Sequence, residues 1–114
     1  MKFAAKTLDS LLSLNSEQLT QRIKMGDLLE RARPIQHVAL FHKRGPSDAW
    51  ILRIRDEGYQ VRTERVGFGG VKVIATTESS LEPERVDDFV ARMYQQVADA
   101  GGHYQGWDGP LVLG

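Results

Sequence analysis

The chain has 114 residues, no cysteine, and fifteen basic residues that balance fifteen acidic ones. This length fits one domain that can bury its own core. The lack of cysteine excludes a disulfide framework and thiolate chemistry, and the neutral charge excludes a general attraction to nucleic acid or membrane surfaces. We therefore expect one cytoplasmic domain, residues 1–114, without a signal peptide or a membrane span.

Residues 1–33 are predicted to be a helical segment. Asn15, with a glutamine three residues later, has the spacing of a capping box. The apolar stripe changes face at Gly26, where Asp27 could cap a second helical stretch over residues 25–32. The proline that follows residue 33 ends the segment, because the residue before a proline is pushed out of helical geometry.

A short strand and a helix are expected next. Residues 35–42 are apolar and bounded by turn-forming residues, which is typical of a strand. Pro46 suits the first turn of the following helix, and Gly58 suits the left-handed residue that closes it. Trp50 lies on the apolar stripe of this helix.

The middle of the chain predicts a hairpin. Residues 59–66 alternate in polarity and residues 67–70 are rich in glycine, so residues 71–77 are expected to form the second arm. A phosphate-binding loop is disfavoured because such a loop leads into a helix, not a strand. Phe68 is expected at the exposed tip.

The clearest element is a helix that begins at Pro83. Its apolar residues recur with helical spacing from Val86 to Ala98, and Gly101 ends it. The remaining residues, 103–113, are expected to supply a last strand that bends in its middle.

The order of elements after residue 34 is strand, helix, strand, strand, helix, strand. It predicts an α+β fold of the ferredoxin-like sandwich kind over residues 34–114, with two helices on one face of an antiparallel sheet. The other sheet face needs a partner, which could be the N-terminal helix, water or another chain.

Residues 101–112, GGHYQGWDGPLV, place Tyr104 and Trp107 among glycines. The tryptophan could be a surface anchor for a partner, or the glycines could let a bent strand carry it into the core. We favour the core. His37 is in phase with Phe41 on its strand, which favours a satisfied core histidine over a functional one.

Three parts of the sequence resemble the family named for the regulator of ribonuclease E activity B. GGHYQGWDGPLV is similar to its closing Y-D-G-W-G segment, MGDLLERARPIQHVALF to its Gly-Asp, Arg and strand pattern, and DEGYQV to its G-Y-x-V helix exit. Gln105 and Asp108 depart from the pattern, standing where the family has an acid and a glycine. The matching positions, which we expect to be structural, are Gly26, Asp27, Arg33, His37, Phe41, Gly58, Tyr104, Gly106 and Trp107.

The resemblance implies a non-enzymatic regulator that binds a ribonuclease E-type endoribonuclease, or its assembly, and lowers RNA cleavage. The best-known member is strongly acidic, whereas this chain is neutral. The residues agree with an absence of catalysis, since no serine or acid stands beside a histidine. The three histidines lack the spacing of metal ligands, so we predict no metal and no cofactor.

Two surfaces are candidates for protein binding. One is an acidic face on the helix after Pro83, and the other is the exposed sheet face. Residues 1–72 carry thirteen basic and eight acidic residues, and residues 73–114 carry two and seven, so the molecule is either bipolar or interleaves these charges on its surface. The candidate residues are Glu82, Glu84, Asp87 and Asp88 for the first surface, and Arg62 and Glu64 for the second.

The rival hypothesis is RNA binding through the open face of the sheet, where related folds stack bases on aromatic side chains. The sheet offers Phe41, Tyr59 and Tyr104 at best, and the core needs the first two. We therefore do not expect direct nucleic-acid binding as the main activity. A homodimer and a small-ligand sensor that pairs through its sheet stay open as further alternatives.

Overall fold

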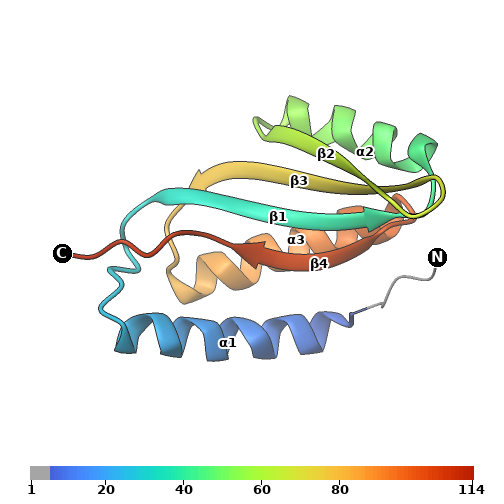
Figure 1. Cartoon of the computed structure of the whole chain (residues 1–114). Helices are drawn as coiled ribbons and strands as arrows, with labels where there is room; N and C mark the ends of the chain where they lie inside the picture. Colours follow the sequence, from blue (N-terminus) through green and yellow to red (C-terminus); the bar gives the residue numbers. More distant parts are fainter. Residues whose placement is uncertain (1–5) are drawn as a thin grey trace.

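In the computed structural model, residues 6–114 are described and form a four-stranded antiparallel sheet with three helices (Figure 1). The strand order is β2-β3-β1-β4. This arrangement confirms the predicted ferredoxin-like α+β sandwich with a preceding helix. The elements are α1 (Leu8–Lys24), β1 (Arg33–Phe41), α2 (Arg44–Asp56), β2 (Gln60–Val66), β3 (Gly70–Ser79), α3 (Pro83–Asp99) and β4 (His103–Asp108).

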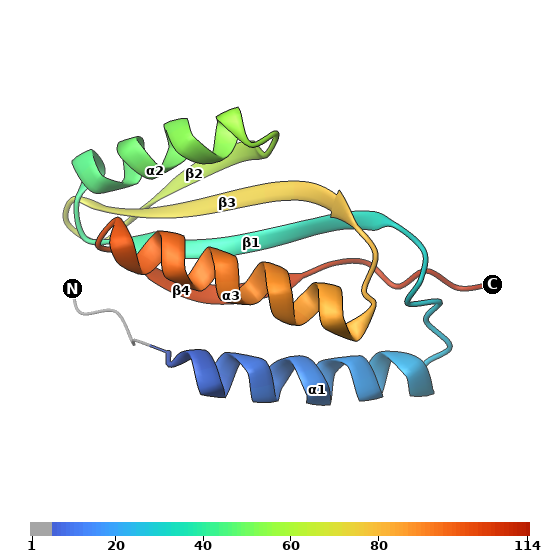
Figure 2. The same ribbon diagram turned by 180° about the vertical axis from the view of Figure 1, so that it is seen from behind.

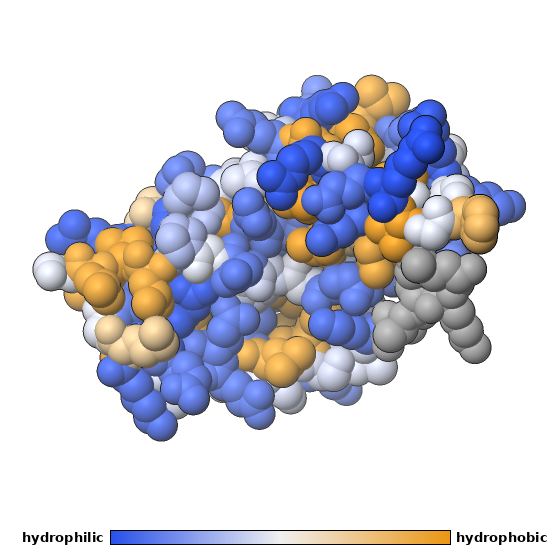
Figure 3. All heavy atoms as spheres, viewed as in Figure 1, coloured by the Kyte–Doolittle hydropathy of each residue, from blue (hydrophilic) through white to orange (hydrophobic). Residues whose placement is uncertain are grey.

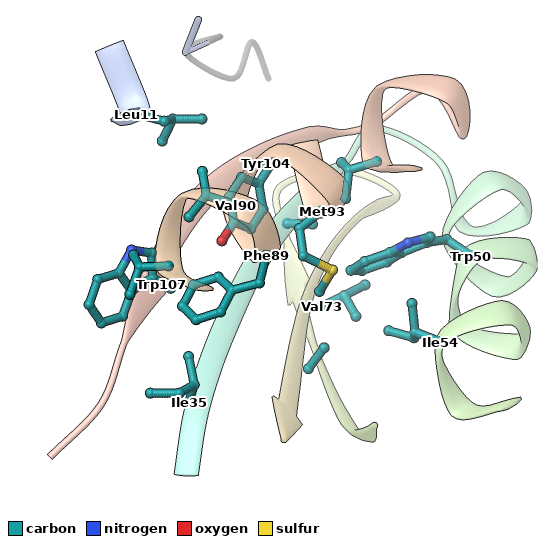
Figure 4. Close-up of a cluster of buried hydrophobic side chains, with 14 of the residues drawn as sticks. Leu11, Ile35, Trp50, Ile54, Val73, Phe89, Val90, Met93, Tyr104 and Trp107 are labelled. Carbon is teal, nitrogen blue, oxygen red and sulfur yellow. The ribbon is translucent and has the colours of Figure 1, made fainter. Parts of the chain in front are cut away.

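The core lies between the sheet and the helices α2 and α3, which cover one sheet face (Figure 2). Burial alternates along β1, with every second residue from Arg33 to Phe41 buried, as expected for a strand with one covered face. Figure 4 shows Phe89 and Met93 of α3 meeting side chains from the sheet and Trp50 of α2 in this cluster. The predicted apolar stripe of α3 is therefore the main helical contribution to the core.

Helix α1 does not cover the opposite sheet face. It lies along the β4 edge of the sheet, beside α3 (Figures 1 and 2), and its buried Leu11 and Leu19 join the same core. None of the helices within residues 6–114 covers the face that carries Arg62 and Glu64. Of the partners considered for that face, the N-terminal helix is excluded.

All three helices end in the same way, with a glycine in the left-handed region. Gly26, Gly58 and Gly101 have φ of +88°, +96° and +86°. In each case the N–H of the glycine and the N–H of the next residue donate hydrogen bonds to carbonyls of the last helical turn. This is the Schellman arrangement, which glycine favours because it lacks a Cβ. Gly58 and Gly101 were predicted as helix ends.

The prediction of a second helical stretch over residues 25–32 is wrong. α1 ends at Lys24, and turns and an irregular segment follow up to β1. Thr7, not Asn15, caps α1 with its side chain, and Asn15 is buried within the helix. Asp27 caps nothing, because buried arginines occupy its carboxylate. Tertiary contacts have overridden local capping preferences here.

Candidate protein-binding surfaces

Trp107 lies in the core, as predicted, and only 8% of it is exposed. Its indole N–H donates to the side-chain oxygen of Asn15 at 2.8 Å. The ring meets Phe89 edge to face, with centroids 5.7 Å apart, and the Arg22 guanidinium carbon lies 5.3 Å from its centroid. The tryptophan is thus not available as a surface anchor.

A bulge in β4 explains how the two rings of the glycine-rich segment both turn inward. Tyr104 and Trp107 are three residues apart, so a regular strand would place them on opposite faces. The pairing with β1 shifts register between Val38 and Ala39, and Gly106 has φ +122° opposite this shift. The extra residue restores the inward direction for the indole. The predicted bend is confirmed.

Asp27 and Arg33 form a buried ion pair beneath the start of β1. Arg33 Nη1 donates to both carboxylate oxygens, at 2.6 and 2.8 Å, and Arg22 Nη1 donates at 3.1 Å. Burial alone would raise the pKa of Asp27, but the hydrogen bonds from Arg33 and Arg22 outweigh it and hold the pKa below its ordinary value. The carboxylate stays ionised, so these motif residues are structural.

Arg22 extends this cluster to the residues after β4. Its Nη2 donates to the Gly109 carbonyl at 2.7 Å and to Asp108 Oδ1 at 3.1 Å. The N–H of Val112 in turn approaches Asp27 Oδ1 at 3.3 Å. Reasoning from sequence did not single out Arg22, because one arginine in the last turn of a helix has no distinctive pattern.

His37 is fully buried, as predicted, but only one of its ring nitrogens is satisfied. Nδ1 lies 2.8 Å from the Tyr104 hydroxyl, whereas Nε2 has no hydrogen-bond partner among residues 6–114. Burial, together with the positive charge of Arg92, lowers the pKa of His37 to about 3. Burial also raises the pKa of Tyr104 well above its ordinary value. The pair is neutral and belongs to the core.

Phe41, another motif position, is fully buried, and the centroid of its ring lies 5.8 Å from that of the Trp50 ring. It faces the helices, not the open sheet face. The structure thus places the motif side chains in the core or in the buried ion pair, and the motif glycines at two helix ends and in the β4 bulge.

The four predicted acids are exposed at the start of α3 and in its first two turns. We call Glu82, Glu84, Asp87 and Asp88 the acidic surface. Asp88 pairs with Arg92 at 3.3 Å, and Asp87 accepts from the Asn15 amide at 3.0 Å. Carboxylates near a helix N-terminus also favour the helix dipole, so they stabilise α3 whatever else they bind.

A second group of charged residues lies at the end of the sheet opposite the acidic surface. The register pairs Arg33 with Ser79 at the end where α3 begins, and Phe41 with Val71 at the other end. There Arg44 and Arg65 line one shallow depression, together with Asp48 and Glu64. The depression carries two basic and two acidic residues, so charges of both signs interleave at this end of the sheet.

The second predicted surface, the open sheet face, is separate from the acidic surface. Arg62 pairs in register with Ile74, and Glu64 with Lys72, whose ammonium lies 3.8 Å from the glutamate. The strands, all within residues 6–114, place no Phe, Tyr or Trp on this face. The structure therefore does not bring the six predicted binding residues together.

A groove between α1 and β4 was not predicted from the sequence. It has a volume of about 660 Å³ and is lined by α1 from Leu11 to Lys24, by Lys6, and by residues 105–107 of β4. On the face in Figure 3, apolar side chains reach the surface over α1 and near the C terminus, among mostly hydrophilic ones. No local pattern reveals such a groove, since it depends on where α1 docks.

The comparisons with known proteins agree with the sequence resemblance. A family model described as regulator of ribonuclease activity B matches residues 13–109, which is most of the chain. A search of curated proteins gives no match. Within residues 6–114, no helix is long and apolar enough to cross a membrane, and no group of three or more histidine or acidic side chains could hold a metal ion.

Proposed function

Because the chain belongs to the regulator of ribonuclease activity B family, we propose that it is a non-enzymatic, cytoplasmic regulator of RNA degradation. It acts by binding an endoribonuclease of the ribonuclease E type, or a protein of the assembly around that enzyme. It needs no metal or cofactor for this role.

The observation that carries the proposal is the acidic surface. Its four carboxylates stand exposed on a helix that the core holds rigidly, and Arg85 and Arg92 are the nearby basic residues on that helix. A basic segment of a partner would be steered toward this end of the molecule, and burial of apolar contacts would then hold it. Binding should weaken as salt is raised, because exposed charges are screened.

The alternative of RNA binding through the open sheet face has less support. Tyr104 and Phe41 are buried beneath the helices, and Tyr59 is half-buried against the same core. Base stacking needs aromatic side chains on the open face. Arg62 and Lys72 offer charge there without a stacking platform, so protein binding is the better-supported role.

Charge reversal on the acidic surface tests the proposal. We expect Glu84→Lys/Asp88→Lys to weaken binding to a purified ribonuclease E-type endoribonuclease at least tenfold in a titration at low salt. The matched control is Asp48→Lys/Asp56→Lys, which makes the same charge change on exposed positions of α2. Equal affinity of the two variants would remove the acidic surface from the proposal, and failure of the wild-type chain to bind would remove the partner.

A further inference from the structure

Helix α1 extends past the start of α3. The two helices touch where the Asn15 amide donates to Asp87 at 3.0 Å. From that contact α1 continues for nine residues, to Lys24, whereas α3 reaches back only four, to Pro83. At 1.5 Å per residue, the end of α1 therefore lies roughly 7 Å beyond the start of α3. Figures 1 and 2 both show this overhang, so α3 does not cover the last turn of α1.

Ile23 lies on the side of α1 that faces α3. It follows Leu19 by one helical turn, and Leu19 is buried in the core, whereas Ile23 is 60% exposed. Gln21 and Lys24 line the groove toward β4, on the other side of α1. Because a helix has 3.6 residues per turn, Ile23 continues the side that packs along α3 and carries it past the start of that helix.

Acids of α3 border the same place. Asp87 lies at the contact with α1, and Glu84 precedes it by one helical turn, so both are on the side of α3 that faces α1. Asp88 follows next on the exposed side. Along the helix axes, Glu84 lies roughly 7 Å from Ile23. We call Ile23, Glu84, Asp87 and Asp88 the overhang surface.

The overhang surface is acidic on one side and uncharged on the other. The two basic residues of α1 are directed elsewhere, because Arg22 is buried and Lys24 lines the groove toward β4. On α3, Arg92 pairs with Asp88 at 3.3 Å and offsets one of the three acids. An apolar side chain thus stands beside a surface whose net charge is negative.

We propose that the overhang surface binds an amphipathic basic helix of a partner protein. An apolar side chain of that helix packs on Ile23, and lysine or arginine side chains about one turn away reach Glu84 and Asp88. Side chains one turn apart on a helix are about 5–6 Å apart, which is close to the axial separation of Ile23 and Glu84. Grooves and faces that bind helices commonly combine an apolar anchor with complementary charge.

Two other kinds of occupant fit the charges less well. A second copy of the chain that used the same surface would bring acids against acids, and like charges across an interface are unfavourable. A nucleic acid would bring phosphates to the same acids. The inference rests on the proposed function and deepens it, because it assigns to Ile23 the apolar contact that holds a partner after charge has steered it to the acidic surface.

The first test uses a synthetic helical peptide of sixteen residues, with leucines on one face and lysines on the adjacent face. It is titrated into the isotope-labelled full chain and followed by amide chemical shifts. We expect saturable shifts at Ile23, Glu84 and Asp88. The same peptide with glutamate in place of lysine should bind at least fivefold more weakly. Shifts confined to the groove between α1 and β4, or no saturable shift, would overturn the proposal.

Two residues at the end of α1 provide matched variants. Met25 is 59% exposed, almost the same as Ile23, but it follows Gln21 by one turn and so lies on the side toward β4. Ile23→Ser should weaken the lysine peptide at least threefold, whereas Met25→Ser should leave its affinity unchanged. Equal thermal midpoints would show that Ile23→Ser acts on binding and not on folding. Equal peptide affinity of the two variants would count against the overhang surface.

Titration of a purified ribonuclease E-type endoribonuclease separates this inference from the proposed function. Ile23→Ser should weaken its binding at least threefold and leave the salt dependence unchanged, because the variant removes no charge. If wild type and Ile23→Ser bind the endoribonuclease equally well, the inference fails and the proposed function stands. If the peptide binds at Ile23 but the endoribonuclease does not bind, the overhang surface stands and the proposed function fails.

A concentration-dependent dimer that Ile23→Ser abolishes would identify a second copy of the chain as the occupant and overturn the proposal. Tighter binding of a single-stranded oligonucleotide than of the lysine peptide, with shifts at the same residues, would overturn it as well.

Discussion

Trp107 and Asn15 join the last strand of the protein to its first helix, through the indole N–H and a side-chain oxygen 2.8 Å apart. The same asparagine donates its amide to Asp87 on α3 at 3.0 Å. One buried side chain thus holds β4, α1 and α3 together. Because an unsatisfied buried donor costs about 1–3 kcal/mol, this contact should contribute measurably to the docking of α1.

Asn15→Ala should lower the free energy of unfolding by about 1–3 kcal/mol, because it leaves the Trp107 indole N–H without its acceptor in a buried site. Urea unfolding followed by tryptophan fluorescence measures this change. Ser13→Ala, two residues away on the exposed side of α1, is the control and should change stability by less than about 0.5 kcal/mol. An unchanged midpoint for Asn15→Ala would mean that water replaces the lost amide.

The ion pair of Asp27 and Arg33 gives a second prediction. Asp27→Asn should destabilise the protein by about 3–5 kcal/mol, because it leaves the buried guanidinium group of Arg33 without its compensating charge, whereas Arg22 keeps Asp108. Chemical denaturation measures the loss, and Asp56→Asn on the surface of α2 is the control. The double variant Asp27→Leu/Arg33→Met should be more stable than Asp27→Leu alone. If the double variant is instead less stable than Asp27→Leu, the two side chains are not energetically coupled.

His37 predicts a loss of stability in mild acid. Its folded pKa of about 3 lies below the ordinary value of 6.5, so the unfolded chain takes up the proton first. The contribution of His37 to the free energy of unfolding is fully present above pH 6.5. It falls by about 1.4 kcal/mol per pH unit between pH 6.5 and 3. The pKa of Asp27 is also lowered. Its contribution to the free energy of unfolding is therefore lost only as the pH falls below its ordinary pKa of 3.8.

Thermal unfolding at pH 7.5 and pH 5 measures the effect of His37. We expect the wild-type chain to lose on the order of 2 kcal/mol over this interval. His37→Gln, which keeps a hydrogen-bonding group near Tyr104 but cannot titrate, should lose clearly less. If the two proteins lose stability in parallel, the acid sensitivity comes from other groups.

The sequence predicted the elements whose patterns are local. The helical spacing of α3, the glycine hairpin before β3, and the glycines after α2 and α3 each depend on residues within one turn or one strand. The fate of residues 25–32 was not predictable in this way, because Asp27 meets Arg33 and Arg22 only after folding. The residues around Asn15 also predicted a capping box. Instead, the Asn15 side chain accepts a hydrogen bond from Trp107, which is 92 residues away in the sequence.

The candidate binding surfaces show the same division. The four acids of the acidic surface were found from the sequence, because polar residues opposite an apolar helix stripe must face solvent. The groove between α1 and β4 has no local signature, since its walls come from segments about ninety residues apart and its shape depends on how α1 docks.

Gly102 and Phe41 give the last prediction. A Cβ on Gly102 would lie 2.5 Å from Phe41 Cε2, and this ring is fully buried and packed against Trp50. Gly102→Ala should therefore destabilise the protein by about 1–3 kcal/mol through overpacking. Gly45→Ala is the control: apart from its chain neighbours and its own helix backbone, no atom of residues 6–114 lies within 4 Å of its Cβ position in α2, so alanine there should be neutral or stabilise by up to about 1 kcal/mol. In a double-mutant cycle, Phe41→Leu should reduce the cost of Gly102→Ala, because the shorter side chain vacates the contested space. Strict additivity of the two changes would show that the backbone at Gly102, and not the ring, determines the need for glycine.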